Sequence, residues 1–550
     1  MFYDVVIIGS GFGGAVMAAR LTPALAPGQT LLVLDKGRDH TDAFDPSASS
    51  EPVNAQGNRF RHSLAPDYLA EVAEVHTDTQ GSLDDGAPTL NVVTGRGIGG
   101  GSNVYDGVSL RCPTTSFERM RAGRRLWPAA YTRAALDPYY QRVEENLSVH
   151  RLEWTDASVP HWQLATKRDY VFAEGCRRIG AAAAPLKLAD RDDHNESWWT
   201  QGQRLEGRQN LTKNYLIDAK QAGAQFRAGH EVTTIEPTSD GYVLHGTRRV
   251  DGGEEPFDLE CRLLVLAAGS IASTGLLLRS RDLFPTARDL DPGGLLGREV
   301  SGNGDYGVSG IVGADYEHLV EGHKGKPMSS FCPTFFAEHQ FILIPFYAPL
   351  LYMTLGQPTH LLRAADPLAL GRRSTTPAKD AQGRVERDWG IDYKRRLKQF
   401  GPRMLTMGCL ALDEGEAEIT LDAQGATTVR WPDTHPATEA RWSAAADAMR
   451  RIYDSLGGEM YLDSYRDTGT VNTAHPLGGC RMAEADDETQ GVVDPFGESF
   501  RNRNLFVVDG AIIPSALGVN PSLTIAAVAE RMAEQIVMGS GTESLASRLG

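Results

Sequence analysis

The feature that most constrains this chain is a glycine-rich turn close to its N-terminus. The apolar run YDVVII is followed by GSGFGG, in which Gly9, Gly11 and Gly14 have the spacing G-x-G-x-x-G. The stretch AVMAARL then has helical apolar spacing, and LLVLD (31–35) is typical of a second strand that ends in Asp35. A strand, a glycine turn, a helix and a second strand in this order predict a βαβ unit that binds a dinucleotide.

Each residue type in this unit has a physical reason. Gly9 allows the tight turn, Gly11 allows a pyrophosphate to approach the backbone, and Gly14 allows the helix to pack closely on the strand. The helix N-terminus offers unpaired N–H groups to the phosphates, and Asp35 is placed to reach a ribose hydroxyl. Since the motif suits NAD and FAD alike, the rest of the chain has to distinguish them.

Size and charge limit the remaining possibilities. A chain of 550 residues exceeds the size at which single cores stop growing, so we expect more than one folding region. Apolar residues at 41% and charged residues at 23% are ordinary globular values, which argues against disorder. A net charge of −16 argues against nucleic-acid binding, which requires a basic face.

The cysteines and the hydropathy pattern bear on metal sites and location. Six cysteines lie far apart without a CxxC pair, so we expect reduced, mostly buried thiols and no metal site. The N-terminus MFYDVVIIGSG has no signal-peptide pattern, and no apolar run reaches the ~18 residues of a membrane helix. These features favour a cytoplasmic protein without a transmembrane segment.

A second glycine-rich stretch, VTGRGIGGGSNVYDG (93–107), follows the first after a long interval. Glycine is entropically costly inside helices and strands, so this stretch predicts irregular backbone. Such a backbone suits close contact with a ligand, and a flexible surface loop is the alternative.

The middle of the chain alternates between segments that predict further strands of the dinucleotide-binding region and segments that carry no dinucleotide-binding signal. LLVLAAG (263–269) predicts a strand and turn before a helix, and 230–237 and 241–246 predict strands of the same or a flanking sheet. In the other kind, TLDAQGATTVRW (420–431) resembles a hairpin, and 438–456 has the pattern of an amphipathic helix.

The C-terminal region contains a histidine in an unusual setting, NTAHPLGGCRM (472–482). His475 could be a buried structural residue, a metal ligand or a catalytic base, and this stretch alone does not decide. Downstream, LFVVDG predicts a buried strand ending in Asp509, VNP contains Asn520, and LTIAAVAERMAEQI predicts a helix.

Together, these blocks resemble the glucose–methanol–choline (GMC) oxidoreductases, and most of all their cholesterol-oxidase-like branch. The resemblance rests on GSGFGG, GRGIGGGS, LVLAAGS, HPLGGCRM, VVDGAIIP and VNPSLT, and GRQNLTKNYL (207–216) also matches that branch. It implies an α/β fold, with a Rossmann-like FAD-binding domain and an interleaved α+β substrate-binding domain that contains a mainly antiparallel sheet. The implied FAD-binding domain is discontinuous, at 1–111, 205–300 and 465–550, and the substrate-binding domain comprises 112–204 and 301–464.

The resemblance also implies which residues bind FAD. They are Gly9, Gly11, Phe12, Gly13, Gly14, Asp35, Lys36, Gly95, Arg96, Gly99, Gly100, Gly101, Ser102, Tyr105, Asp106, Val232, Ala268, Gly269, Asp509, Gly510, Asn520, Pro521 and Ser522.

For the chemistry, the resemblance implies that His475 and Asn520 face the substrate hydroxyl beside the flavin. A neutral imidazole can accept the alcohol proton while hydride passes from the carbinol carbon to flavin N5. Asn520 can hydrogen-bond the same oxygen and orient the C–H bond. The expected activity is therefore FAD-dependent oxidation of an alcohol to a carbonyl, with O2 or another acceptor reoxidising the flavin.

The chain departs from the family pattern at several positions. Tyr105 and Asp106 replace an Asn and a Gly, so either could line the substrate site or change its electrostatics, unless both side chains point away. These two residues keep open a flavin-dependent lyase or isomerase without net alcohol oxidation. Ile342 aligns with the Glu that moves a double bond in sterol enzymes, which argues against isomerisation. Val104 stands near the position of a flavin-linking histidine, which favours non-covalent FAD.

The apolar run FILIPFYAPLLYMTLG (341–356) is the main indication of a substrate class. It could line a pocket for a sterol or another hydrophobic natural product, with Ile342 and Tyr105 as weak candidates for substrate contact. Ordinary core packing explains the run equally well.

Overall fold

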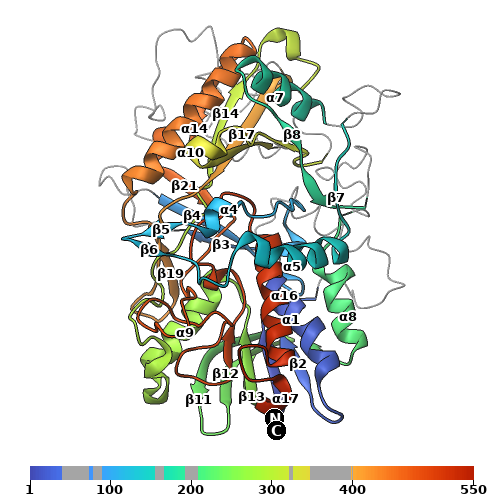
Figure 1. Ribbon diagram of the computed structural model, residues 1–550, viewed down its shortest axis with the longest axis vertical. Coiled ribbons are helices and arrows are strands. Elements are labelled where there is room, and N and C mark those ends of the chain that lie inside the picture. The colour runs from blue at the N-terminus through green and yellow to red at the C-terminus, as the bar shows by residue number, and fades with distance from the viewer. Residues whose placement is uncertain are drawn as a thin grey trace.

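The structure is a computed structural model that describes residues 1–39, 73–77, 89–154, 166–191, 208–320, 326–346, 398 and 401–550. A seven-stranded sheet occupies the half that is lower in Figure 1, where both termini also lie. Its order is β10-β2-β1-β13-β12-β11, with β22 added beside β13. Its strands are β1 (Phe2–Ile8), β2 (Leu31–Leu34), β10 (Gln225–Arg227), β11 (His230–Pro237), β12 (Tyr242–Val250), β13 (Gly253–Leu266) and β22 (Leu505–Val507).

The parallel part of this sheet is its core. β10, β2, β1, β13 and β22 run parallel, whereas β12 and β11 are antiparallel additions. The inner strands consist of fully buried branched residues, as parallel strands covered on both faces require. Helices α1 (Phe12–Leu21), α8 (Tyr215–Gln221) and α16 (Ser522–Met538) pack together, and α9 (Ser270–Leu283) packs on β11. The predicted βαβ unit and the added strands are confirmed.

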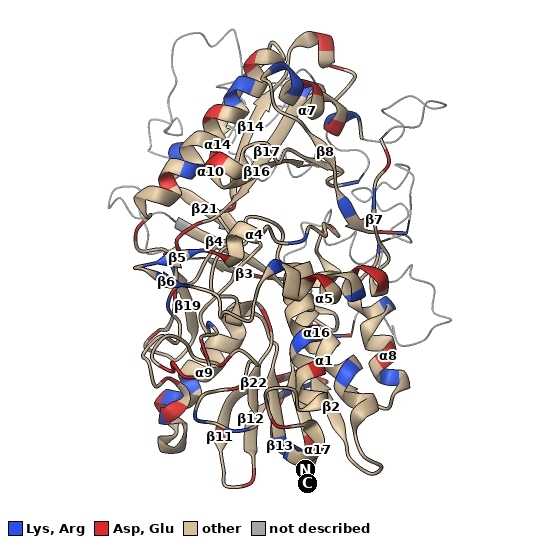
Figure 2. Cartoon of the chain, in the orientation of Figure 1, with Lys and Arg blue, Asp and Glu red and all other residues tan. Residues whose placement is uncertain are grey.

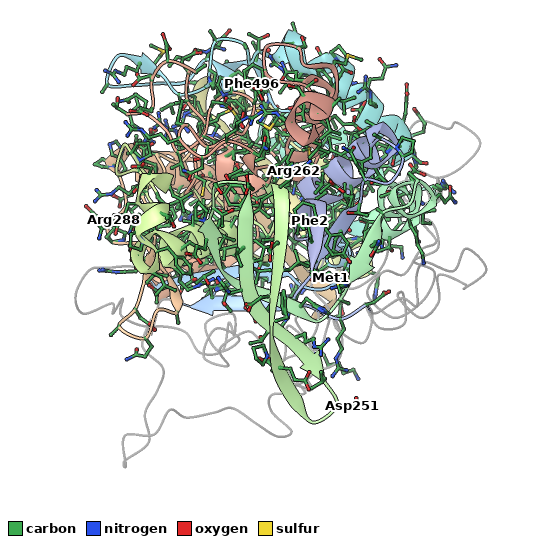
Figure 3. The ribbon with its side chains drawn as sticks, turned by 90° about the horizontal axis from the view of Figure 1, so that it is seen from below. Met1, Phe2, Asp251, Arg262, Arg288 and Phe496 are labelled. Atoms are coloured by element: carbon green, nitrogen blue, oxygen red, sulfur yellow. The ribbon has the colours of Figure 1, made fainter. Side chains whose placement is uncertain are left out.

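One strand is longer than its apolar run predicts. β13 begins at Gly253, ten positions before the run LLVL, because its polar first half pairs with β12. Figure 3 shows this pair projecting from the body of the molecule, with Asp251 at its tip. The exposed half of the ladder carries charged side chains, so hydropathy alone does not reveal it.

A four-stranded antiparallel sheet forms the other half, with the order β16-β17-β14-β20. Its strands are β14 (Tyr306–Ile311), β16 (Phe341–Phe346), β17 (Met404–Ala411) and β20 (Glu459–Asp463). Helix α14 (Pro436–Ser455) covers it and contacts α7 (Lys167–Arg178). Figure 2 shows Lys, Arg, Asp and Glu on these helices, while β14, β16 and β17 contain none. The predicted fold class is confirmed, and α14 and the hairpin of β18 (Glu418–Leu421) and β19 (Thr427–Arg430) match their predicted ranges.

A small sheet with the order β21-β4-β3 links the two halves. Its strands are β3 (Ala73–Thr77), β4 (Thr89–Gly95) and β21 (Thr470–Thr473). β4 leads into the second glycine-rich stretch, which is more regular than predicted. Gly95 is the last residue of the strand and Gly100–Asn103 forms a 3-10 turn, because glycines can adopt the positive φ angles that such tight turns need.

Short elements complete the described chain, together with one longer helix that contacts α16. They are α4 (Thr114–Phe117), β5 (Met120–Arg121), β6 (Arg124–Arg125), α5 (Arg133–Asn146), β7 (Val149–Arg151), β8 (Ala184–Pro185), β9 (Lys187–Ala189), β15 (Ser330–Phe331), α10 (Phe336–His339), α15 (Ser464–Thr468) and α17 (Leu545–Leu549). All six cysteines are buried free thiols, as expected. No helix of the described residues is long and apolar enough to cross a membrane.

Candidate active site

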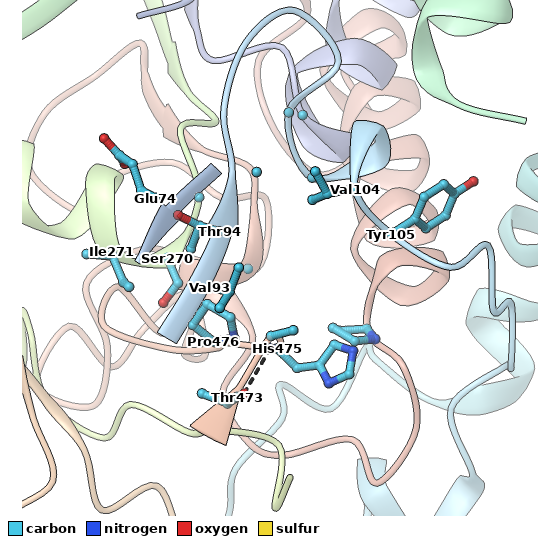
Figure 4. A pocket seen from close by; sticks show the side chains of 18 of the residues that line it. Glu74, Val93, Thr94, Val104, Tyr105, Ser270, Ile271, Thr473, His475 and Pro476 are labelled. Atoms are coloured by element: carbon cyan, nitrogen blue, oxygen red, sulfur yellow. Dashed lines mark hydrogen bonds between the residues drawn. The ribbon is translucent and has the colours of Figure 1, made fainter. Parts of the chain in front are cut away.

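A cavity of about 970 Å³ lies where the ends of β1, β2 and β13 meet the small sheet and the four-stranded sheet. The residues that line it come from every block that the sequence singled out. Figure 4 shows part of this lining, with Val104 and Tyr105 on one side and His475 near Thr473 on the other. The cavity therefore brings together segments separated by several hundred residues.

The first glycine turn forms one end of the cavity, and its glycines differ in what surrounds them. A Cβ on Gly9 would lie 2.3 Å from the Ala267 carbonyl oxygen, and one on Gly14 would lie 2.0 Å from that of Gly9. A Cβ on Gly13 would lie 1.5 Å from the Val508 carbonyl oxygen. On Gly11, by contrast, the nearest atom is 4.0 Å away, so this residue faces open space in the cavity. Gly9, Gly13 and Gly14 thus allow close packing against backbone carbonyl groups of the protein, whereas the space beside Gly11 is free for a ligand.

Helix α1 begins beside this space. Gly11 is its N-cap and provides no side-chain cap, so the first N–H groups of the helix remain available to a ligand. Phe12 and Gly13, the first residues of the helix, line the cavity. An N-terminus of this kind attracts phosphate groups.

Asp35 directly follows β2, and its carboxylate is buried. It accepts hydrogen bonds from the Ser10 hydroxyl at 2.6 Å and from the Gly37 amide at 2.9 Å, and it lines the cavity. Burial raises the pKa of the Asp35 carboxyl, and these hydrogen bonds offset part of that shift. Next to it, Lys36 forms an ion pair with Glu74 of β3.

The second glycine stretch touches the first. A Cβ on Gly100 would lie 2.8 Å from Gly11 Cα, and the Gly99 amide donates to the Ser10 hydroxyl at 3.0 Å. A Cβ on Gly101 would meet no atom within 4 Å, and this residue lines the cavity. Of the two alternatives for this stretch, close contact with a ligand fits the geometry better than a free surface loop.

Asp509 joins the ends of two neighbouring parallel strands. Its carboxylate accepts from the Gly269 amide at 2.8 Å, from the Ser273 hydroxyl at 2.6 Å and from the Ala511 amide at 2.8 Å. Burial raises the pKa of this carboxyl. Asp509, Gly510 and Gly269 all line the cavity.

His475 and Asn520 meet at the cavity. His475 follows β21, and its Nδ1 lies 2.8 Å from a carboxylate oxygen of Asp305. Its Nε2 lies 3.2 Å from Nδ2 of Asn520, which precedes α16. The Asn520 Oδ1 is buried without a hydrogen-bond partner in the described part of the chain. An imidazole nitrogen that accepts a hydroxyl proton and an amide N–H that donates to the hydroxyl oxygen together suit recognition of an alcohol group.

Tyr105 lines the cavity with its ring but directs its hydroxyl elsewhere. The hydroxyl donates to the Gln209 carbonyl oxygen at 2.6 Å, and Figure 4 shows it pointing away from His475. The ring makes an edge contact with Phe12 at a centroid distance of 5.4 Å. Burial raises the pKa of this phenol. Tyr105 therefore narrows the cavity without offering it a hydroxyl, while Asp106 and Val104 also line the wall.

Four expected contacts lie elsewhere. Gly14 packs α1 on the end of β1, and a Cβ on Gly99 would meet Asn103 at 2.8 Å. The Ser102 hydroxyl donates to the Gly99 carbonyl oxygen at 2.7 Å and accepts from the Leu211 amide, so it is occupied within the protein. Ile342 is buried in β16 and is absent from the described cavity lining.

The remaining expected residues do line the cavity. They are Lys36, Gly95, Arg96, Val232, Ala268, Pro521 and Ser522.

The side of the cavity near the four-stranded sheet is largely apolar. Met328, Phe346, Leu410 and Leu462 line it. Phe346 belongs to the apolar run at 341–356, of which residues 347–356 lie outside the described residues. Among the residues described, no group of three His, Cys, Asp or Glu side chains could hold a metal ion.

Sequence reasoning missed three residues of the site. Asp305, Asn303 and Ser10 make hydrogen bonds that organise it. Asp305 and Asn303 lie in GNGDYG, which carries no motif, and Ser10 occupies a variable position of the glycine motif. Only their proximity in space reveals them.

Comparison with known proteins identifies one family over most of the chain. The family model described as GMC oxidoreductase matches residues 3–281 with its N-terminal part and residues 416–529 with its C-terminal part. A cholesterol oxidase of Mycobacterium tuberculosis is 28% identical over 96% of this chain and 90% of its own length. A long-chain-alcohol oxidase of Arabidopsis thaliana is 25% identical over 97% of this chain and 67% of its own.

The fold has solved counterparts as well. The crystal structure of pyridoxine 4-oxidase from Mesorbium loti superimposes with a TM-score of 0.65 at 17% identity, covering 97% of this chain and 99% of that one. At this level of identity the match speaks for the fold alone.

Proposed function

Because the chain belongs to the GMC oxidoreductase family and is therefore an FAD-dependent oxidoreductase acting on CH–OH donors, we propose that it oxidises a hydrophobic alcohol with His475 as the base. The observation that carries this proposal is the contact between His475 Nε2 and Asn520 at 3.2 Å, inside the cavity that both glycine stretches border. A base and a hydrogen-bonding amide at one point are what proton removal from an alcohol requires.

FAD suits the described residues. Gly11 and Gly101 leave open the space that a Cβ would fill, and α1 presents uncapped N–H groups there. The pyrophosphate would lie against this turn and Asp35 would face the ribose. Bound FAD supplies the hydride acceptor for the reaction. Val104 is aliphatic and lines the cavity, which supports a non-covalent cofactor.

The chain's own residues have separate tasks in this reaction. His475 accepts the hydroxyl proton at Nε2, which a base within hydrogen-bond reach of the substrate can do. Asn520 turns from its present partner to the substrate oxygen and fixes the orientation of the carbinol C–H bond. The apolar wall with Met328 and Phe346 excludes water and receives the hydrocarbon part of the substrate. The names of the relatives, which refer to a sterol and to long-chain alcohols, support this substrate class.

The test is anaerobic titration of the purified holoenzyme with sterols, long-chain alcohols and polar alcohols. We expect the flavin's visible absorbance to bleach with a hydrophobic alcohol. In His475→Ala the rate of bleaching should fall by roughly 10²–10⁴-fold, the usual contribution of a general base. His318→Ala, at an exposed histidine, is the matched control and should bleach at the wild-type rate.

Two results would refute the proposal. The first is a bound flavin that no alcohol reduces, and the second is a wild-type rate in His475→Ala. Retention of the flavin spectrum in each variant shows that the fold and the cofactor site are intact.

A further inference from the structure

One tight turn, residues 302–305, contacts the surroundings of both proposed active groups. It precedes β14, and its two polar side chains leave in different directions. Asp305 reaches His475, and Asn303 reaches the loop that leads to Asn520. These partners are 170 and 216 positions away in the sequence, so only the tertiary fold creates the arrangement.

Asp305 is held firmly against the histidine. Its two oxygens lie 2.9 and 2.8 Å from His475 Nδ1. One of them also accepts hydrogen bonds from the Thr473 hydroxyl at 2.9 Å and from the Ala474 amide at 3.2 Å. The carboxylate is thus fixed to the end of β21 at several points, and the imidazole ring cannot rotate without breaking this contact.

This contact determines which nitrogen carries the proton in the neutral ring. A carboxylate accepts hydrogen bonds and donates none, so Nδ1 bears the hydrogen and Nε2 keeps its lone pair. The lone pair in turn favours the N–H side of the Asn520 amide, which is the side that lies 3.2 Å away. Asp305 therefore orients the base and, through it, the amide.

Asn303 fixes the second group by a different route. Its Oδ1 accepts from the amides of Leu517 at 2.8 Å and Gly518 at 3.1 Å, and its Nδ2 donates to the Val519 carbonyl oxygen at 2.8 Å. The side chain is fully buried, and three hydrogen bonds hold the backbone directly before Asn520. Asn303 has a φ of +58°, a left-handed conformation that asparagine tolerates better than most residues.

The turn itself is anchored from both sides. The Gly304 amide donates to the buried Asp413 carboxylate at 2.8 Å. The Thr473 hydroxyl lies 2.9 Å from the Gly302 carbonyl oxygen and 2.9 Å from Asp305, and these two acceptors share its one proton. Since β21, β14 and the loop before α16 all meet at this turn, displacement of the turn would move His475 and Asn520 relative to each other.

From this geometry we infer that Asp305 and Asn303 are positioning residues for alcohol oxidation. Asp305 keeps His475 in the tautomer whose Nε2 can accept a proton, and Asn303 sets the place of Asn520. This inference rests on the proposed function of His475. Neither residue contacts the reacting atoms, so each acts through another group.

The test compares Asp305→Asn, Asp305→Glu and Asn303→Ala with the wild-type holoenzyme in stopped-flow flavin reduction. In Asp305→Asn the new amide N–H can face Nδ1, which would place the proton on Nε2 and remove the acceptor. We expect the limiting rate of reduction to fall by roughly 10²-fold while the alcohol concentration at half-maximal rate changes little. Asp305→Glu should recover part of the rate, and Asn303→Ala should lose about 10-fold.

A spectroscopic signal separates positioning from general damage. In protein labelled with ¹⁵N-histidine, the two ring nitrogens of a neutral imidazole have distinct shifts, and His475→Gln identifies the His475 signals by their absence. We expect the Nδ1–H form in the wild type and the Nε2–H form in Asp305→Asn. Asp422→Asn is the matched control, because Asp422 accepts amide hydrogen bonds in the exposed turn between β18 and β19.

The outcomes distinguish this inference from the proposed function. If His475→Gln is impaired while Asp305→Asn keeps the wild-type rate and tautomer, the inference about Asp305 is wrong, and the proposed role of His475 as the base still holds. If His475→Gln reduces flavin at the wild-type rate, the proposed function fails and the inference falls with it. If Asp305→Asn loses its flavin, the ¹⁵N signals of His475 in the wild-type protein still test the inference. The Nε2–H form in the wild type would overturn it.

Discussion

The two walls of the cavity are built in different ways. The wall proposed to hold the cofactor consists of backbone: glycines packed against carbonyl groups, and a helix N-terminus without a cap. The opposite wall, where His475 and Asn520 lie, consists of side chains joined by hydrogen bonds. On the first wall, an added methyl group on Gly9, Gly13 or Gly14 would collide with backbone atoms, whereas Gly11 has free space beside it. On the second, the identity and proton of each polar group matter.

The two walls also differ in how well the amino-acid sequence predicts them. The motif of the first wall consists of neighbours in the sequence, since the strand, the turn and the helix are consecutive, and its glycines then pack against Ala267 and Val508. The second depends on three separate segments, around residues 303–305, 473–475 and 517–520. Local patterns reveal the first wall, and hydrogen bonds across the fold define the second.

The largest expected effect comes from adding a methyl group to the backbone wall. Gly13→Ala places a Cβ 1.5 Å from the Val508 carbonyl oxygen. Although alanine favours helices, we expect a loss of about 4 kcal/mol or more in unfolding free energy, measured by denaturant titration. Gly253→Ala, where nothing lies within 4 Å, should change stability little. Equal stability of the two variants would contradict the close packing of α1 on β22.

Gly11→Ala separates cofactor binding from packing on the same wall. The added Cβ has only one atom within reach, at 4.0 Å, and Gly11 has an ordinary extended conformation. We expect an apoprotein of near wild-type stability whose FAD affinity is lower by roughly 10²-fold, or about 2.7 kcal/mol. Fluorescence quenching during FAD titration of the apoprotein measures this. Unchanged affinity would mean that the pyrophosphate does not approach Gly11.

Behind the turn at 302–305, a buried carboxyl group should make the stability of the protein depend on pH. Glu416 lies near Asp413, the residue that anchors the turn at 302–305. Burial, together with the charge of Asp413, raises the pKa of Glu416 from 4.5 to about 7. Between these values the folded state binds more protons than the unfolded state, so this group's contribution to stability declines as pH rises.

Glu416→Gln removes that titration. Relative to the wild type, this variant should gain about 2 kcal/mol in unfolding free energy between pH 5 and pH 8. Denaturant titrations at several pH values measure the difference, with Glu418→Gln in the adjacent strand as control. Parallel stability curves for Glu416→Gln and the wild type would show that the carboxyl group does not titrate in this range.

The smallest effect is expected at Tyr105, whose ring lines the cavity beside Phe12. Tyr105→Phe removes one hydrogen bond, to the Gln209 carbonyl oxygen at 2.6 Å, and keeps the ring against Phe12. Stability should fall by about 1 kcal/mol, and the rate of flavin reduction should stay at the wild-type value. A large loss of rate would instead place the hydroxyl in the reaction and revive the specialised chemistry that this residue suggested.

The sequence by itself predicted the βαβ unit with its glycine turn, and it placed further strands in the same or a flanking sheet. The glycine spacing, the apolar strands and the position of Asp35 follow from short-range geometry, which a linear pattern records. The resemblance to a family then drew attention to His475 and Asn520. The division into domains at the predicted boundaries stays a prediction.

Only the tertiary structure decided how those groups are held. Ser102 and Tyr105 belong to an expected motif, yet their hydroxyls bond within the protein and leave the cavity to others. Asp305 and Asn303 belong to no motif, yet they contact His475 and the loop before Asn520. The physical reason is that a hydrogen bond depends on distance and direction in space, and residues 170 positions apart acquire these only when the whole chain has folded.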